Sequence, residues 1–221
     1  KKEFGIDIAP ELGGFEEIHL YRCARTGLRF YSPASIAGSA ELYRRLESLE
    51  YYYLDQKWEH DVAIAEMRAG ERVLDVGCGR GAFVRRMIDR GVRGEGLESN
   101  LSAAQAAQAE GLTVHTENLS SYAAGCPEAY DAVCAFQVLE HVPDPRTFLE
   151  LMVAMLKPGG KLILAVPNHD SFIAHATNNL LDGPPHHVTQ WARSVLEHLP
   201  ALLPLEADHF LCEPLAENHV S

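Results

Sequence analysis

Acidic side chains and a run of glycines in the middle of the chain have the types and spacing of a ligand site. The segment VLDVGCGRGAF (73–83) places Asp75 among apolar residues that suit a buried strand, and Gly77, Gly79 and Gly81 follow it. Glycine can adopt positive φ and lets the backbone approach a ligand closely. A carboxylate inside such a strand is costly unless it meets a cation or hydrogen-bond donors. The turn is therefore predicted to hold a ligand.

A second acidic residue, Glu98, closes the next apolar run, GEGLES (94–99), 21 residues beyond Gly77. An acid at this place can accept hydrogen bonds from both hydroxyls of a ribose. The spacing Gly77-x-Gly79-x-x-Ala82 also satisfies the relaxed dinucleotide fingerprint, so a nicotinamide-dependent dehydrogenase is an alternative. Asp75 argues against it, because a negative charge beside the turn suits an ammonium group better than a pyrophosphate. S-adenosylmethionine carries an ammonium and a sulfonium and no phosphate.

The elements around these residues alternate between apolar runs and helical patterns. Strands are expected at 72–77, 94–99, 112–116, 131–136 and 161–167, and helices at 81–91, 101–111 and 146–156, the last begun by Asp144 and Pro145. Strands that alternate with helices predict an α/β fold with a doubly wound, mostly parallel sheet. In such sheets the ligand lies beyond the carboxyl ends of the strands.

The flanking segments follow a different pattern. Residues 16–23 and 28–33 predict a small hairpin, and helical patterns cover 39–54 and 58–67. A helix at 189–199 and a sixth strand at 207–214 are expected near the end of the sequence. We therefore expect an N-terminal appendage of hairpin and lid helices at 1–68 and a cofactor-binding domain at 69–221, in which the C-terminal strand is truncated or replaced.

Two stretches resemble a known family. VLDVGCGRGAF resembles the first motif of the class I S-adenosylmethionine-dependent methyltransferases, and residues 130–168 (YDAVCAFQVLEHVPDP…KLILAVPN) resemble the later motifs of the branch that acts in ubiquinone and menaquinone biosynthesis. The resemblance covers roughly residues 70 to 200. It implies a Rossmann-like domain, S-adenosylmethionine as cofactor and transfer of its methyl group to an oxygen, carbon or nitrogen atom of a small molecule. The motifs are specific for cofactor and fold and weak for the acceptor.

The resemblance also implies roles for single residues. The methionine end of the cofactor would lie against Asp75 and the backbone of Gly77, Cys78 and Gly79, and the ribose against Glu98 with Ser99 beside it. The remaining cofactor contacts implied are Asn118 and Leu119 near the adenine, and Phe136 and Gln137 near the methyl donor. Relatives often carry Asp at the adenine position, so Asn118 departs from the family pattern.

Histidines supply the candidates for catalysis. His141, in the segment LEHV, and His187, in NNLLDGPPHHVTQW (178–191), could act at the acceptor, and each could instead only pack. His186 and His187 could also bind a metal, but adjacent histidines are expected to point in different directions, so no metal site is predicted. The acceptor pocket is expected between 39–60 and 171–191, with an aromatic side chain from the first facing a histidine from the second.

Composition excludes several classes of partner. The chain has 221 residues and a net charge of -12, which repels phosphate backbones, so no nucleic acid is expected to bind. No apolar run is long enough for a membrane span, and the first residues lack the apolar core of a signal peptide. The five scattered cysteines suggest reduced thiols and a cytoplasmic location. A non-catalytic subunit that only binds the cofactor remains a further alternative.

Overall fold

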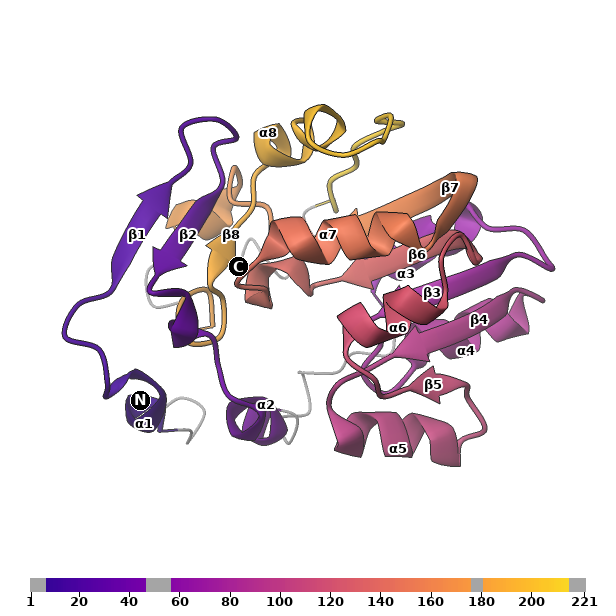
Figure 1. Cartoon of the computed structure of the whole chain (residues 1–221), viewed down its shortest axis with the longest axis horizontal. Helices are drawn as coiled ribbons and strands as arrows, with labels where there is room; N and C mark the ends of the chain where they lie inside the picture. Colours follow the sequence, from indigo (N-terminus) through magenta and orange to yellow (C-terminus); the bar gives the residue numbers. More distant parts are fainter. Residues whose placement is uncertain (1–6, 47–56, 176–180, 215–221) are drawn as a thin grey trace.

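A five-stranded parallel sheet forms the centre of the protein (Figure 1). The computed structural model describes residues 7–46, 57–175 and 181–214. The strands of the sheet are β3 (Arg72–Val76), β4 (Arg93–Leu97), β5 (Val114–His115), β6 (Tyr130–Phe136) and β7 (Leu156–Ala165). Their spatial order is β5-β4-β3-β6-β7, and every neighbouring pair is parallel. The strand order therefore reverses between β3 and β6, which is the place where such sheets bind ligands.

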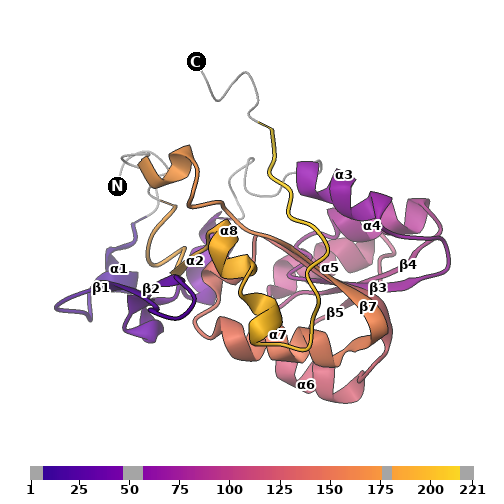
Figure 2. The same cartoon turned by 90° about the horizontal axis from the view of Figure 1, so that it is seen from above.

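Helices cover both faces of the sheet, as Figure 2 shows. One face carries α3 (Trp58–Ala65), α4 (Ala82–Asp89) and α5 (Leu101–Ala109), and the other carries α6 (Leu119–Gly125) and α7 (Pro145–Ala154). Side chains of β3 alternate between these layers: Val73 packs with the first set and Leu74 with the second. This alternation confirms the predicted doubly wound α/β architecture, because each strand is buried on both sides.

Side-chain caps fix where several helices begin. Asn100 accepts hydrogen bonds from the backbone N–H groups of Ser102 and Ala103, and Asp144 accepts one from Thr147. Asn118 caps α6 through the N–H of Ser121. The sequence analysis did not predict α6, because its serine- and alanine-rich run has no clear apolar period. The cap at Asn118 was the signal that could have revealed it.

The predicted hairpin is present and is joined by a strand from the far end of the sequence. The N-terminal elements are α1 (Ala9–Leu12), β1 (His19–Arg22), β2 (Arg29–Ser32), the 3-10 turn η1 (Ala34–Ile36) and α2 (Ala40–Leu46). β1 and β2 pair antiparallel, and β8 (Thr189–Gln190) adds to β2 as a third antiparallel strand. This small sheet thus joins strands from both sides of the domain boundary that was expected near residue 68.

The expected helix at 189–199 is wrong in its first half. Thr189 and Gln190 are extended because they pair with β2, and the Thr189 hydroxyl donates to Leu139 O and accepts from Trp191 Nε1. The helical part is only α8 (Arg193–Leu196), followed by the 3-10 turn η4 (Leu199–Ala201).

The expected sixth strand at 207–214 is also wrong, since this segment forms no strand. Most of its residues are exposed, including Leu211 at 54%. A strand without a buried face lacks the packing that fixes its register.

Two other boundaries differ from the prediction. β7 begins at Leu156 and runs through the segment KPGG, which was expected to separate helix from strand. The helix expected at 39–54 is described as α2 up to Leu46, and its remaining residues, including Leu49 and Tyr53, lie outside the described part of the chain. Among the described residues, no helix combines the length and apolar character that a membrane crossing requires.

Candidate active site

The turn between β3 and α4 has the backbone shape that its glycines predicted. Gly77, Gly79 and Gly81 have φ values of 77°, 54° and 78°. A Cβ built on Gly77 would lie 2.6 Å from Val138 Cγ2, so a side chain there would clash as well as strain the backbone. The turn therefore brings β3 and the segment after β6 close together around an open backbone surface.

Asp75 lies at the floor of this turn and is 3% exposed. Burial raises the pKa of Asp75 to about 8, with Lys57 opposing the rise and Glu98 adding to it. Without a cation the carboxyl group therefore holds its proton at neutral pH. A positively charged group placed beside it would favour the ionised form.

Glu98 ties the end of β4 to the glycine turn. Its Oε2 accepts a 2.8 Å hydrogen bond from the N–H of Gly79, and its Oε1 accepts a 2.7 Å bond from the N–H of Asn100. A carboxylate has about four lone-pair sites, so it can accept from more than two donors. Ser99 follows on the exposed side of the same strand end.

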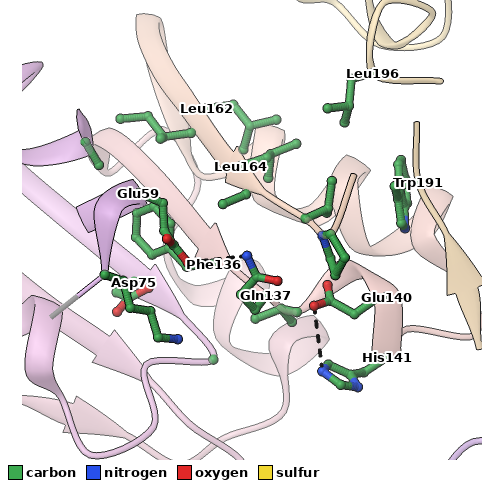
Figure 3. A pocket seen from close by; sticks show the side chains of 18 of the residues that line it. Glu59, Asp75, Phe136, Gln137, Glu140, His141, Leu162, Leu164, Trp191 and Leu196 are labelled. Atoms are coloured by element: carbon green, nitrogen blue, oxygen red, sulfur yellow. Dashed lines mark hydrogen bonds and ion pairs between the residues drawn. The ribbon is translucent and has the colours of Figure 1, made fainter. Parts of the chain in front are cut away.

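The end of β6 completes this edge. Phe136 packs edge-on against Phe83 and against His60, with ring centroids 4.8 Å and 5.0 Å away. Gln137 has a φ of 56°, unusual for a residue other than glycine, and its Nε2 donates to Glu59 Oε1 at 3.3 Å. This bond links β6 to α3, so α3 stands beside the carboxyl ends of the strands (Figure 3).

One open cavity of about 2670 Å³ runs along this edge of the sheet. Ten of the residues singled out from the sequence line it: Asp75, Gly77, Cys78, Gly79, Glu98, Ser99, Phe136, Gln137, His141 and His187. The volume exceeds the roughly 300–1,000 Å³ of a pocket for one drug-sized ligand, so a cofactor and an acceptor can share it. Asn118 and Leu119 do not line the cavity; Asn118 caps α6, and Leu119 packs under the sheet.

Histidines from two distant segments form the other end of the cavity. The ring of His141 lies 4.5 Å from that of His186 and 4.9 Å from that of His187, centroid to centroid. The two neighbouring rings, His186 and His187, are stacked at 4.6 Å with an angle of 21°. The expectation that adjacent histidines diverge is therefore wrong here, because the turn at 183–187 and separate hydrogen bonds align the rings.

The described parts of the segments 39–60 and 171–191 meet at this cavity, as predicted. The aromatic ring that faces the histidines is Tyr43, whose centroid is 5.6 Å from His141 and 5.9 Å from His186. Its hydroxyl donates to His186 O at 3.4 Å. Three further aromatic residues of the segment 39–60, Tyr51, Tyr52 and Tyr53, lie outside the described residues.

Two contributors to the cavity, Lys57 and Asp182, were missed by the sequence analysis. Lys57 is close enough to oppose the pKa rise of Asp75, and nothing in its local sequence marks it. Asp182 accepts hydrogen bonds from His187 Nδ1 at 3.2 Å and from His169 Nε2 at 3.1 Å. Burial alone would raise the pKa of Asp182, yet these histidines hold it below its usual value. The sequence signal that could have revealed this contact is the acidic residue Asp182, shortly before the pair His186 and His187.

Leucine side chains form an apolar wall beside the histidines. Leu162 and Leu164 come from β7 and Leu196 from α8, and Figure 3 shows them above Gln137 and Glu140 with Trp191 at the far side. Polar groups thus gather at the strand ends and apolar groups along β7. The cavity can hold a polar ligand and an apolar one next to each other.

Comparison with known proteins agrees with this arrangement. A family model described as a methyltransferase domain matches residues 51–210. The chain is 28% identical over 193 residues to the ubiquinone biosynthesis O-methyltransferase of Pectobacterium carotovorum subsp. carotovorum (strain PC1), with 84% of this chain and 77% of the relative covered. It is 37% identical over 108 residues to the protein of the same name from Pseudomonas fluorescens (strain SBW25), which covers 46% of this chain and 47% of that one. The chain thus spans about half the length of this second relative.

Solved structures share the fold. A SAM-dependent methyltransferase from Archaeoglobus fulgidus superposes with a TM-score of 0.57 at 23% identity, over 75% of this chain and 69% of the other. The YcgJ protein from Bacillus subtilis gives a TM-score of 0.54 at 23% identity, over 65% and 66%. The family match covers most of the chain, and the fold is that of these structures. The chain therefore belongs to the class I S-adenosylmethionine-dependent methyltransferases.

Proposed function

We propose that the protein transfers a methyl group to an oxygen atom of a small molecule whose body is largely apolar. The observation that carries the proposal is the division of one cavity between the carboxylates at the strand ends and the leucine wall of β7 and α8. The names of the Pectobacterium and Pseudomonas relatives support an oxygen acceptor. A net charge of -12 disfavours nucleic acid as the acceptor.

On this proposal the carboxylates hold the cofactor. Asp75 would pair with the ammonium group of the methionine end, and Glu98 would accept hydrogen bonds from the ribose hydroxyls. The buried Asp75 carboxyl supports this fit. Its pKa is raised to about 8 even though the positive charge of Lys57 acts to lower it, so an ammonium group beside it would favour its ionised form. The backbone of Gly77, Cys78 and Gly79 would lie against the methionine end.

The remaining cofactor contacts follow from the strand order. Phe136 and Gln137 would line the methyl-donor side, and Ser99 would lie next to the ribose. Asn118 and Leu119 follow β5, the neighbour of β4; because their side chains cap α6 and pack under the sheet, only their backbone would be left to contact the adenine.

The acceptor side of the cavity would be organised by His141 and His187. S-adenosylmethionine supplies a methyl group on a sulfonium, which leaves as a neutral thioether and needs no proton. Catalysis therefore rests mainly on alignment of the acceptor oxygen with the methyl group. The hydrogen bond from His187 Nδ1 to Asp182 orients the ring, so that Nε2 points away from Asp182. His141 and His187 would then hold the reacting hydroxyl.

Location is a further part of the proposal. All five cysteines are unpaired, including Cys23, Cys126 and Cys212, which are not fully buried. Thiols of this kind persist in a reducing compartment, which supports a cytoplasmic protein.

Calorimetric titration and a transfer assay test the function together. S-adenosylmethionine should bind with micromolar affinity, about -7 to -8 kcal/mol. Cofactor labelled in the methyl group should then pass label to hydroxylated apolar compounds and not to their deoxy analogues. Tighter binding of NADH than of S-adenosylmethionine would favour the dehydrogenase alternative. Cofactor binding with no transfer to phenols, amines or activated carbon acids would favour a non-catalytic subunit.

A further inference from the structure

A cluster of three imidazoles lies where the segment after β6 meets the loop before β8. His141 ends the 3-10 turn η2 (Leu139–His141), and His186 and His187 lie 45 and 46 residues further along the chain. One ring nitrogen from each histidine lies within 4.8 Å of one from each of the others. We propose that His141, His186 and His187 bind a divalent first-row transition-metal ion, with Zn²⁺ as the expected occupant.

The hydrogen bonds of the cluster select the tautomer that a metal requires. Nδ1 of His141 is 2.7 Å from His186 O, Nδ1 of His186 is 2.9 Å from Leu181 O, and Nδ1 of His187 is 3.2 Å from Asp182 Oδ1. Carbonyl and carboxylate oxygens only accept, so each Nδ1 donates, and each neutral ring carries its lone pair on Nε2. Metal-binding histidines are oriented in this way by carbonyls and carboxylates behind them.

Glu140 provides a second, independent observation that points to a cation at this site. The side chain is 2% exposed, and its Oε1 is 3.9 Å from His141 Nε2. Its Oε2 is buried and accepts no hydrogen bond from the described residues. Figure 3 shows the carboxyl group beside His141. A buried carboxylate oxygen without a donor is costly, and a divalent ion held by the three rings would give Oε2 a partner, with Glu140 as a fourth ligand.

Ligand chemistry decides between metals. Imidazole nitrogens suit Zn²⁺, Fe²⁺, Ni²⁺ and Cu²⁺, whereas Mg²⁺ and Ca²⁺ prefer oxygen ligands. Zn–N bonds of about 2.0–2.1 Å require nitrogen atoms roughly 3.3–3.5 Å apart in a tetrahedral site. The rings must therefore close slightly around the ion, which small rotations about the side-chain bonds can provide.

A metal at this place would give the histidines a shared task in the proposed reaction. The cluster and Glu140 line the same cavity as the cofactor residues, so an ion that expands to a fifth coordination position would take up the acceptor there. A hydroxyl bound to a divalent ion loses its proton more readily, and its oxygen becomes a better nucleophile. This consequence rests on the proposed function, whereas the metal site itself does not.

Metal binding can be measured without cofactor or acceptor, which separates this proposal from the methyltransferase reaction. The full chain, stripped with a chelator, is titrated with ZnCl₂ and separately with MgCl₂, and bound metal is counted by mass spectrometry. We expect one tight Zn²⁺ per chain and no Mg²⁺ at the same concentrations. Co²⁺ should give the visible absorption of a nitrogen-ligated site.

Variants locate the ion. His186→Gln and His187→Gln should each weaken Zn²⁺ binding at least 10-fold, while His198→Gln, an exposed histidine on the far segment, should leave it unchanged. S-adenosylmethionine binding by each variant reports whether it has folded, and the two cluster variants guard against failure of either one. Wild-type Zn²⁺ affinity in both cluster variants, or equal binding of Mg²⁺ and Zn²⁺, would overturn the proposal.

Discussion

The two ends of the cavity are built in different ways. At the cofactor end, Asp75, the glycine turn and Glu98 come from one continuous strand–helix–strand unit between residues 72 and 98. At the histidine end, Tyr43, Glu140 and the loop 181–187 come from three segments far apart in the sequence. The first end is therefore defined by local backbone geometry, and the second exists only when the tertiary structure is complete.

This difference has an energetic counterpart. The cofactor end keeps its shape through backbone–backbone bonds, such as those from the N–H of Gly77 to Leu97 O and from the N–H of Gly81 to Cys78 O. The histidine end depends on buried side chains and their hydrogen bonds, such as that from His186 Nδ1 to Leu181 O. Changes at the first end should act on cofactor binding and stability, and changes at the second on the acceptor step.

The largest expected effect concerns the pH dependence that Asp75 gives to stability. The groups that affect or respond to this carboxyl are Lys57, Glu98, Cys78 and Cys134. Its pKa is about 8 in the fold and about 3.8 when unfolded, so the folded state binds the proton more tightly. The contribution of Asp75 to the free energy of unfolding is present at low pH and is lost as pH rises through 8. From pH 6 to 8 the loss reaches about 2.7 kcal/mol at most.

Urea unfolding of the ligand-free protein at several pH values measures this loss. The comparison is with Asp75→Asn, which has the same shape and no titration, so groups common to both proteins cancel. The free-energy difference between wild type and variant should move in favour of the variant as pH rises from 6 to 8. Parallel pH profiles would show that Asp75 is already ionised in the fold.

Glu98→Ala should have the next largest effect, on cofactor affinity. The change removes the carboxylate that would bind the ribose and also the acceptor for the N–H groups of Gly79 and Asn100. We expect a loss of about 1.5–3 kcal/mol in binding of S-adenosylmethionine, measured by calorimetry. The affinity of Glu98→Gln, which keeps one acceptor oxygen, should lie between those of the wild type and Glu98→Ala. Wild-type affinity in Glu98→Ala would remove the ribose assignment.

Gly77→Ala tests the shape of the turn itself. Alanine at this positive φ is strained, and its Cβ would meet Val138 Cγ2 at 2.6 Å. Gly111→Ala is a matched control, because Gly111 has a φ of 82° and open space around its Cβ position. The control should cost about 1 kcal/mol of stability from strain alone, and Gly77→Ala about 1 kcal/mol more from the clash. Equal costs in thermal unfolding would mean that Val138 moves aside freely.

The same contrast explains how much the sequence could predict. The strand–turn–helix unit at Asp75 and the acid at Glu98 carry their signals within about 25 residues, so the fold and the position of both acids along one cavity were predicted correctly, and their contacts with the cofactor stay a prediction. Thr189 and Gln190 were predicted to be helical because their partner strand, at Arg29 and Phe30, lies 159 to 161 residues away. Local pattern contains no information about such a pairing.

The histidine end shows the same limit at the level of side chains. The segments that meet were predicted, but the ring that faces the histidines, Tyr43, was not, since helix periodicity does not say which side of α2 meets the loop. The alignment of His186 with His187 depends on Leu181 O and Asp182, which are fixed only in the folded loop. Lys57 likewise gains its position near Asp75 from the packing of α3.

The smallest expected effect on cofactor binding, and the sharpest test of the contrast, comes from His187→Ala. The ring hydrogen-bonds to Asp182 and stacks on His186, and it contacts none of Asp75, Gly79 or Glu98 in the hydrogen bonds and ring contacts described. Acceptor positioning and donor binding then use separate groups. Turnover should fall at least 10-fold, while affinity for S-adenosylmethionine should change by less than about 0.5 kcal/mol.

Tyr43→Phe is the matched change on the facing element. It removes the hydroxyl that donates to His186 O and keeps the ring that packs on His141. A smaller fall in turnover than in His187→Ala is expected, because the rings stay aligned through their own bonds to Leu181 O and Asp182. Calorimetry of each variant beside a labelled-methyl assay separates the two steps. A loss of cofactor affinity in His187→Ala as large as in Glu98→Ala would show that the two ends act as one unit, and the division proposed here would fail.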